Sequence, residues 1–174
     1  MFNVLKRPLQ IVDPSDVRRF TRDHYQQYLE EFRIGRPREN RVIFSGLRSI
    51  HDPIGDEFKH PGLYAHFEKI VSNNKTLYNL LNVGSSNSTA YNVVESNKQF
   101  GLKDRLQKAK STALGTKKTK PYPAIEKAIR DCVNPKNIVY MWARCHEARF
   151  VLDQEVLLHR KFKPLYNNGI TKTL

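Results

Sequence analysis

The segment from residue 62 to residue 83 constrains the fold most, because it has the pattern of two strands joined by a tight turn. Residues 63–71 are apolar and aromatic, and residues 76–83 form a second run of this kind. Ser72, Asn73 and Asn74 lie between them and are residue types that favour turns. The pattern predicts an antiparallel β-hairpin.

Helices are predicted on both sides of this hairpin. Asp13 can cap a helix that starts at Pro14 and ends by Gly35. Residues 84–97 are expected to form a loop, followed by helices over residues 100–113 and 124–132. Residues 137–145 predict a third strand and residues 147–162 a final helix, while residues 41–44 are a candidate for a further short strand.

These elements predict an α+β fold, with a small three-stranded antiparallel sheet flanked by helices and an N-terminal helical arm. We expect residues 1–58 to form the arm and a linker, residues 59–168 the core, and residues 169–174 a tail.

The charge balance indicates a polyanionic partner. Thirty Lys and Arg face 17 Asp and Glu, which gives a formal net charge of +13. Such an excess favours nucleic acid, and we expect no membrane partner. Much of the excess lies between residues 103 and 136. The predicted DNA-binding residues are Lys103, Lys110, Lys117, Lys118 and Lys120 in this segment, with Arg18 and Arg22 on the first helix.

The two cysteines, Cys132 and Cys145, are not spaced as a metal knuckle, and we expect both to be reduced thiols. Residues 1–10 lack the apolar run of a signal peptide. A cytoplasmic location is therefore expected.

Short motifs resemble those of the GIY-YIG nuclease superfamily, which is named for its G-[IVL]-Y and Y-[IV]-G elements. The matching residues are Gly62-Leu63-Tyr64 in the first strand of the hairpin, Asn82-Val83-Gly84 in the second, Arg105 on the next helix, Glu155 on the last helix, and Asn167 at the end of Lys163-Pro164-Leu165-Tyr166-Asn167. The resemblance covers about residues 60–168. The long gap between Gly84 and Arg105 and the N-terminal arm are similar to the type II restriction endonuclease branch.

The resemblance implies a role for each matching residue. Glu155 would hold one Mg²⁺, which prefers oxygen ligands, and Mn²⁺ is expected to substitute for it. Arg105 would grip the scissile phosphate, and Tyr64 would orient the attacking water or accept its proton. Asn167 would support the site. No organic cofactor is implied.

The chain departs from the family pattern at two positions. Asn82 stands where the second motif begins with Tyr, so Tyr91 and His66 are candidates to replace the missing hydroxyl. Ala109 stands where the family often has His or Lys, with Lys108 and Lys110 on either side, and Lys108 is a further candidate site residue. Glu147, Asp153 and His159 are alternative metal ligands on the last helix.

The expected function is that of a Mg²⁺-dependent endonuclease acting on double-stranded DNA, with a bacterial or phage-encoded type II restriction enzyme as the leading role. A restriction enzyme that reads a palindrome uses two copies related by a two-fold axis, so a homodimer is expected. Two alternatives stay open. One is a phage or mobile-element nuclease of looser specificity, and the other is a degenerate nucleic-acid-binding protein that has lost the chemistry.

Overall fold

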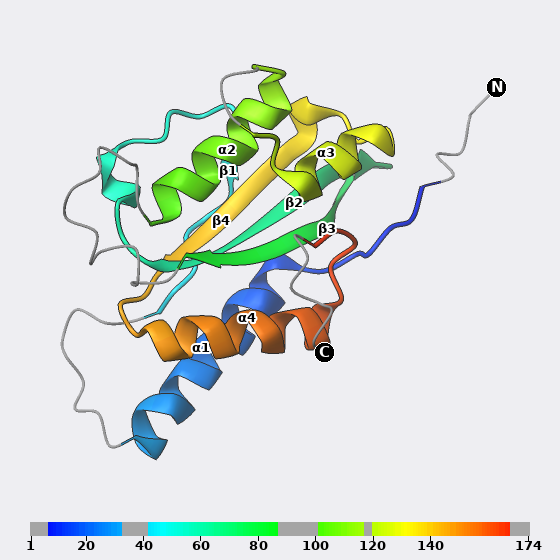
Figure 1. The fold of residues 1–174 in the computed structure, drawn as a ribbon. Helices are drawn as coiled ribbons and strands as arrows, with labels where there is room; N and C mark the ends of the chain where they lie inside the picture. Colours follow the sequence, from blue (N-terminus) through cyan, green and yellow to red (C-terminus); the bar gives the residue numbers. More distant parts are fainter. Residues whose placement is uncertain (1–6, 33–41, 87–100, 117–119, 168–174) are drawn as a thin grey trace.

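The chain folds into three layers, with a β-sheet between two pairs of helices (Figure 1). The computed structural model describes residues 7–32, 42–86, 101–116 and 120–167. Helices α2 (Leu102–Leu114) and α3 (Pro123–Arg130) cover one face of the sheet. Helices α1 (Pro14–Glu31) and α4 (Ala148–Phe162) cover the other, and α1 packs on α4. None of the helices in these ranges combines the length and hydropathy that a membrane span requires.

The sheet is antiparallel and has the strand order β1-β4-β2-β3. Its strands are β1 (Arg48–Ser49), β2 (Gly62–Ser72), β3 (Lys75–Ser86) and β4 (Ile138–Arg144). The α+β class is confirmed, but the prediction of three strands is wrong, because β1 adds a fourth strand beside β4. No strand forms over residues 42–44. A two-residue strand is too short to show the alternation by which strands are recognised in a sequence.

The β2–β3 hairpin forms where it was predicted and is longer than expected. Its turn residues Asn73 and Asn74 have φ of 50° and 60°, and this left-handed conformation is the one that tight hairpin turns require. Strand β3 continues to Ser86, although a loop was predicted from residue 84. It continues because residues 84–86 pair with residues 62–64 of β2.

The helices also lie close to their predicted positions. The Asp13 side chain accepts a hydrogen bond from the Ser15 N–H and caps α1. Helix α1 ends at Glu31, before the predicted stop at Gly35. Two short 3-10 helices, η1 (Asp56–Phe58) and η3 (Pro135–Asn137), lie in the connections.

Each face of the sheet has its own hydrophobic core. On the α1/α4 face, Leu63, Ala65 and Phe67 of β2 pack with the helical side chains. On the α2/α3 face, Tyr64 of β2 packs with residues of both helices. Alternate residues of a strand point to opposite faces, so Tyr64, His66 and Glu68 share the α2/α3 face.

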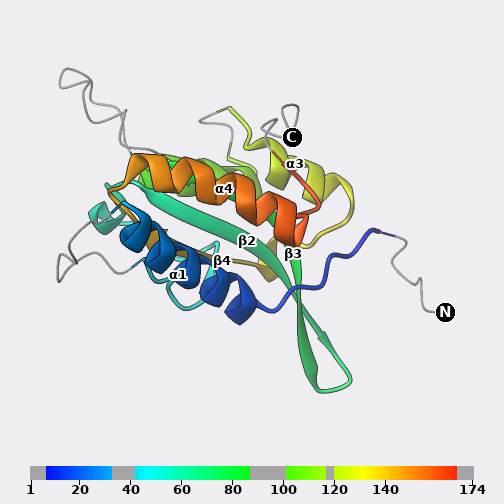
Figure 2. The same ribbon diagram turned by 90° about the horizontal axis from the view of Figure 1, so that it is seen from below.

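The outer edge of β3 pairs with segments from both ends of the chain. Leu80 N–H donates to the carbonyl of Gln10 at 2.8 Å, and the Leu80 carbonyl accepts from Leu165 N–H at 3.2 Å. Tyr166 N–H donates to the Leu81 carbonyl at 2.8 Å. Both segments run beside β3 (Figure 2). An edge that would otherwise be open to other strands is therefore closed at these residues.

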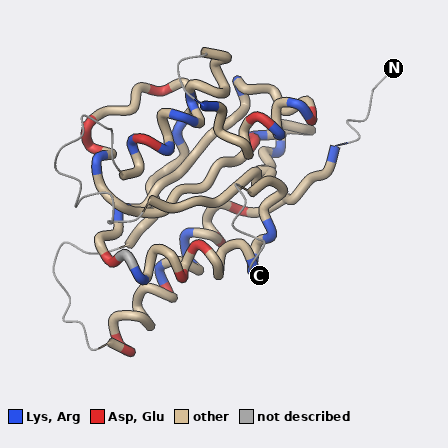
Figure 3. The backbone as a smooth tube through the Cα atoms, in the orientation of Figure 1, with Lys and Arg blue, Asp and Glu red and all other residues tan. Residues whose placement is uncertain are grey.

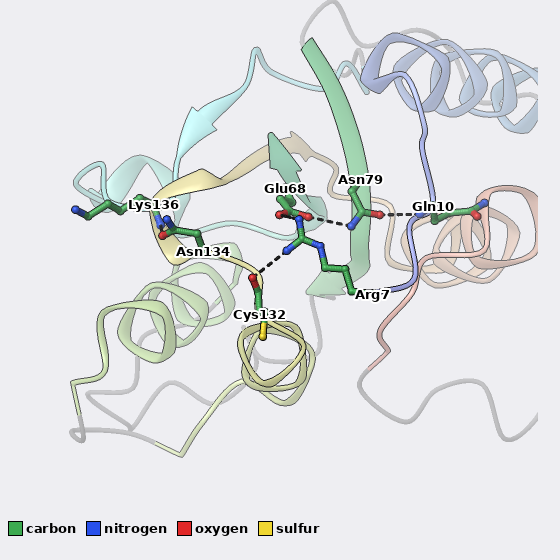
Figure 4. Close-up of polar contacts among 7 residues, drawn as sticks. All are labelled: Arg7, Gln10, Glu68, Asn79, Cys132, Asn134 and Lys136. Carbon is green, nitrogen blue, oxygen red and sulfur yellow. Dashed lines mark hydrogen bonds and ion pairs between the residues drawn. The ribbon is translucent and has the colours of Figure 1, made fainter. Parts of the chain in front are cut away.

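A buried ion pair fixes the N-terminal segment to the sheet (Figure 4). The Arg7 guanidinium contacts the carboxylate of Glu68 and donates to the Cys132 carbonyl at 2.9 Å. The Asn79 side chain donates to the second oxygen of Glu68 at 3.1 Å and accepts from Gln10 N–H at 2.7 Å. The Glu68 carboxylate is thus buried with its charge paired and both oxygens bonded.

Candidate active site

Tyr64 and Gly84, which belong to the two motifs of the hairpin, lie directly opposite each other on β2 and β3. A Cβ atom added to Gly84 would lie 2.2 Å from the Tyr64 hydroxyl oxygen, so the tyrosine ring lies over the glycine. Gly62 is equally confined, since a Cβ there would lie 2.0 Å from the Ala143 carbonyl oxygen of β4. Both motif glycines are needed for close approach.

The Tyr64 hydroxyl is hydrogen-bonded to the hydroxyl of Tyr122, which comes from the segment just before α3. Tyr122 in turn accepts a hydrogen bond from the Asn82 amide at 3.1 Å, and the Asn82 carbonyl oxygen is 2.8 Å from His66 Nδ1. All four side chains are buried, and Tyr64 is only 2 % exposed. Two strands and a loop thus supply one continuous hydrogen-bonded network.

The direction of the bonds follows from the Asn82 amide. Its oxygen can only accept, so His66 donates from Nδ1 and its Nε2 has no proton. His66 Nε2 has no hydrogen-bond partner among the described residues. A buried Nε2 without a proton destabilises the fold less than a buried N–H that has no acceptor. Burial lowers the pKa of His66 to about 4. The imidazole is therefore neutral at physiological pH and acts as a donor to Asn82.

Glu155 approaches the same end of β3 from the opposite face of the sheet. It lies on α4, is 4 % exposed, and accepts a hydrogen bond from the hydroxyl of Ser85, the residue after Gly84. Burial raises the pKa of Glu155, whereas the Ser85 hydrogen bond and the charge of Arg105 lower it. A cation placed beside this buried carboxylate would therefore stabilise its charged form.

Arg105 is near enough to both residues for its charge to lower their pKa values. It lies on α2, its side chain is exposed, and within the described ranges no hydrogen bond or ion pair holds it. Burial raises the pKa of Tyr64 well above its ordinary value, Tyr122 raises it further, and the positive charge of Arg105 lowers it. Arg105 therefore lowers the pKa values of both Tyr64 and Glu155, and the part of the chain that the structure describes leaves its donors open to an anion.

The predicted residues Tyr64, Arg105 and Glu155 thus lie near the same end of β3, with Tyr64 and Glu155 on opposite faces of the sheet. Asn82 and His66 are linked to Tyr64 through Tyr122. Asn167 follows Tyr166, which is bonded to Leu81, so Asn167 lies beside the same strand. Asn82 pairs with His66 rather than with Tyr64 and reaches Tyr64 only through Tyr122. Lys108 is held in an ion pair with Asp104 at 3.3 Å. Tyr91 lies outside the described residues.

Glu155 is the best-placed metal ligand on α4. His159 Nε2 donates to the Val83 carbonyl at 3.1 Å, which occupies that nitrogen, and Asp153 is exposed. Glu147 is the N-cap residue of α4. The described residues hold no group of three or more His, Cys, Asp or Glu that could enclose a metal ion. A single buried carboxylate fits Mg²⁺, which keeps several waters and is completed by phosphate oxygens of the substrate.

Those predicted DNA-binding residues that the structure describes do not form one surface. Lys103 is bonded to Asp56 at 2.6 Å and Lys110 to the Asp52 carbonyl at 3.0 Å, so both tie α2 to the loop before β2. Acidic and basic residues are mixed over α2 and α3 (Figure 3). Lys120 is exposed, and Lys117 and Lys118 lie outside the described residues. Arg18, bonded to the Ser45 carbonyl at 2.8 Å, and exposed Arg22 lie on α1, across the sheet from α2.

The sequence reasoning missed two residues of the site, Tyr122 and Ser85. Tyr122 lies in a Pro-Tyr-Pro segment between the helices predicted over residues 100–113 and 124–132. An aromatic residue between two prolines has little conformational freedom, which was the one available signal. Ser85 could have been found from its position beside Gly84 once β3 was extended.

Comparison of the chain with protein-family models, with curated proteins and with solved structures gave no match.

Proposed function

We propose that the chain is a Mg²⁺-dependent endonuclease that cleaves double-stranded DNA, with a GIY-YIG-like core and restriction as its leading role. One observation supports this above the others. Tyr64, Arg105 and Glu155, which the motifs single out from three separate elements, lie near enough for the charge of Arg105 to lower the pKa values of both Tyr64 and Glu155. The order of hairpin, two helices, strand and helix also agrees with the motif order.

The proposed reaction divides the work among these side chains. Arg105 binds a non-bridging oxygen of the scissile phosphate and balances its charge. Tyr64 orients the attacking water through its hydroxyl group, and its phenolate form accepts the proton that the water loses. Glu155 would hold Mg²⁺, which supplies charge stabilisation for the phosphate and the leaving 3′ oxygen. Asn82 and His66 keep Tyr64 in place through Tyr122.

A non-catalytic DNA-binding protein is the second candidate. The near-complete burial of Tyr64 and Glu155 favours it, because reacting groups must reach the substrate. The exposed Arg105 and the net charge of +13 would serve binding alone equally well. The two candidates therefore differ in whether DNA is cut.

The deciding experiment incubates the purified protein and two α4 variants with phage DNA and Mg²⁺. We expect the wild type to cut and Glu155→Gln to lose cleavage while it retains DNA binding, because a neutral amide holds Mg²⁺ poorly. Asp153→Asn removes an exposed carboxylate of the same helix and should cut normally. Discrete fragments indicate a restriction enzyme and a smear a nuclease of looser specificity. Intact DNA with every protein and with Mn²⁺ would leave the binding protein.

A further inference from the structure

The end of the β2–β3 hairpin, which comprises residues 69–77 and is called the hairpin tip below, extends beyond the helices that cover the sheet (Figure 2). Strand pairing continues without a break to Ser72 and Lys75, so the tip is a regular two-stranded ribbon. All residues from 71 to 77 are exposed, and Val71 is 68 % and Leu77 41 % exposed. The described helices therefore leave this ribbon open to a partner.

The charge of the tip indicates which partner fits. The tip contains Lys69 and Lys75 and no Asp or Glu. Both lysines are exposed, and no ion pair within the described ranges holds either of them. An open hollow of about 580 Å³ lies beside the tip, and its lining includes Lys69 and Lys136 together with the buried Arg7–Glu68 ion pair. Since Arg7 balances Glu68, the two lysines leave the hollow positive, which suits a polyanion.

The thickness of the ribbon selects one groove of DNA. A β-ribbon with its side chains is roughly 10 Å thick, the spacing at which sheets pack. The major groove of B-DNA is about 12 Å wide and the minor groove about 6 Å, so a ribbon enters only the major groove. The register places Lys69 and Val71 on one face of the ribbon and Lys75 and Leu77 on the other. Each face therefore presents one cation to one of the two phosphate backbones that flank the groove.

The turn places two amide side chains at the leading end of the ribbon. Asn73 and Asn74 are both exposed and have left-handed backbones, with φ of 50° and 60°. Glycine would serve this turn conformation equally well. What asparagine adds is an amide that donates and accepts hydrogen bonds, and an amide pairs with the N6 and N7 atoms of adenine in the major groove.

We propose that the hairpin tip enters the major groove of double-stranded DNA. Asn73 and Asn74 contact base edges there, and Lys69 and Lys75 contact the flanking phosphates. This inference rests on the DNA binding that the proposed function includes, and it names the element that determines sequence preference. The tip thereby supplies the DNA-binding surface that the predicted basic residues of α1 and α2 do not form.

The tip is close enough to the candidate active site for one duplex to reach both. Tyr64 and Ser72 belong to the same strand, and eight residues of strand separate them. At about 3.3 Å per residue, the tip lies at most roughly 26 Å from Tyr64. One turn of B-DNA is about 34 Å long, so bases and scissile phosphate fall within a single turn.

The first test reverses one charge at the tip. Lys75→Glu should weaken binding to a random-sequence duplex by at least ~8-fold at about 0.1 M salt, the factor for one lost phosphate contact. Lys161→Glu is the matched control, because Lys161 is an exposed lysine on α4 and the net charge changes equally. It should bind nearly as the wild type does, since salt screens a charge far from the phosphates. Equal losses in the two variants would overturn the hairpin as the DNA-binding element.

The second test concerns the bases. Asn73→Gly combined with Asn74→Gly keeps the turn and removes both amides. Preferred duplexes are selected from a random library with the wild type, and their affinity is compared with that of shuffled duplexes. In the double variant this ratio should fall by at least ~5-fold, the lower value for one base contact. Affinity for the shuffled duplexes should stay the same, and an unchanged ratio refutes the base contacts.

Dimethyl sulfate identifies the groove, because it methylates guanine N7 in the major groove and adenine N3 in the minor groove. The wild type should protect guanine N7, and Lys75→Glu should lose this protection. Protection of adenine N3 alone would overturn the proposal.

The two proposals fail in different ways. A wild type that protects guanine N7 but leaves DNA intact with Mg²⁺ and Mn²⁺ refutes the nuclease and supports the hairpin. A wild type that cuts DNA while all tip variants bind and cut equally well refutes the hairpin and supports the nuclease. Thermal unfolding of each variant verifies that it is folded.

Discussion

At the scale of single residues, Gly84 leaves the space that the Tyr64 ring occupies. The Tyr64 hydroxyl lies where a Cβ of residue 84 would be, at 2.2 Å. No side chain larger than hydrogen fits at residue 84 unless the ring moves. The glycine thus determines where the phenol of Tyr64 points, and it does so through the backbone of the neighbouring strand.

Gly84→Ala should therefore reduce cleavage by at least ~100-fold, because misplacing a reacting group by about 1 Å can cost this much. The tyrosine ring must shift and its bond with Tyr122 is lost. DNA binding should be retained, since Arg105 is unaffected. Gly46→Ala is the control, because a Cβ at Gly46 meets nothing within 4 Å. Equal cleavage by both variants would show that the Tyr64 ring does not depend on Gly84.

The residues of the site differ in how far the sequence could reveal them. Tyr64, Arg105 and Glu155 stand in short motifs whose spacing follows from the elements that bear them. Tyr122 has no such spacing, because its contact with Tyr64 joins a loop to a strand far earlier in the chain. Only the packing of α2 and α3 on the sheet brings the two hydroxyls together.

At the scale of elements, local signals predicted most of the fold. Asp13 marked the start of α1, and the Asn-rich turn marked the hairpin, since both act within a few residues. The signals failed where pairing at long range decides the structure. Strand β1 forms because it pairs with Tyr140 and Val139 of β4. The last residues of β3 are extended because they pair with β2.

The element that carries a lysine also determines what its side chain contacts. Lys103 is bonded to Asp56 at 2.6 Å, whereas Lys120 is exposed in the segment before α3. Lys120→Ala should reduce the slope of log affinity against log salt by about 0.9, the value for one phosphate contact. Lys103→Ala should reduce it less, since Asp56 already neutralises that charge. Fluorescence anisotropy between about 50 and 200 mM salt measures both slopes. Equal slopes would exclude the segment before α3 from the DNA interface.

At the scale of the whole molecule, buried histidines link stability to pH. Burial lowers the pKa of His66 to about 4, and it also lowers those of His60 and His159. An unfolded chain binds a proton at each histidine near its ordinary pKa of about 6.5. Since the folded pKa lies below this value, the stabilising contribution is complete above pH 6.5 and is lost as the pH falls toward 4.

We expect His66 alone to reduce the free energy of unfolding by about 2 kcal/mol between pH 7 and pH 5. Denaturant unfolding at the two pH values measures it. In His66→Gln the loss on acidification should be smaller by this amount, because glutamine does not titrate. His146→Gln, which removes an exposed imidazole, controls for the loss of one histidine. An equally steep loss in His66→Gln would show that His66 is charged in the folded protein.

The pairing of β3 with both terminal segments has a consequence for how the chain reaches this fold. The β2–β3 hairpin is local and can form early, whereas Gln10 and Leu165 must arrive from opposite directions along the chain to close its outer edge. Until then the edge can pair with another chain, so aggregation is most probable during this interval and not after folding is complete. In hydrogen exchange, the amide of Leu80, which donates to Gln10, should gain protection later in refolding than the β2–β3 amides that bond only within the hairpin.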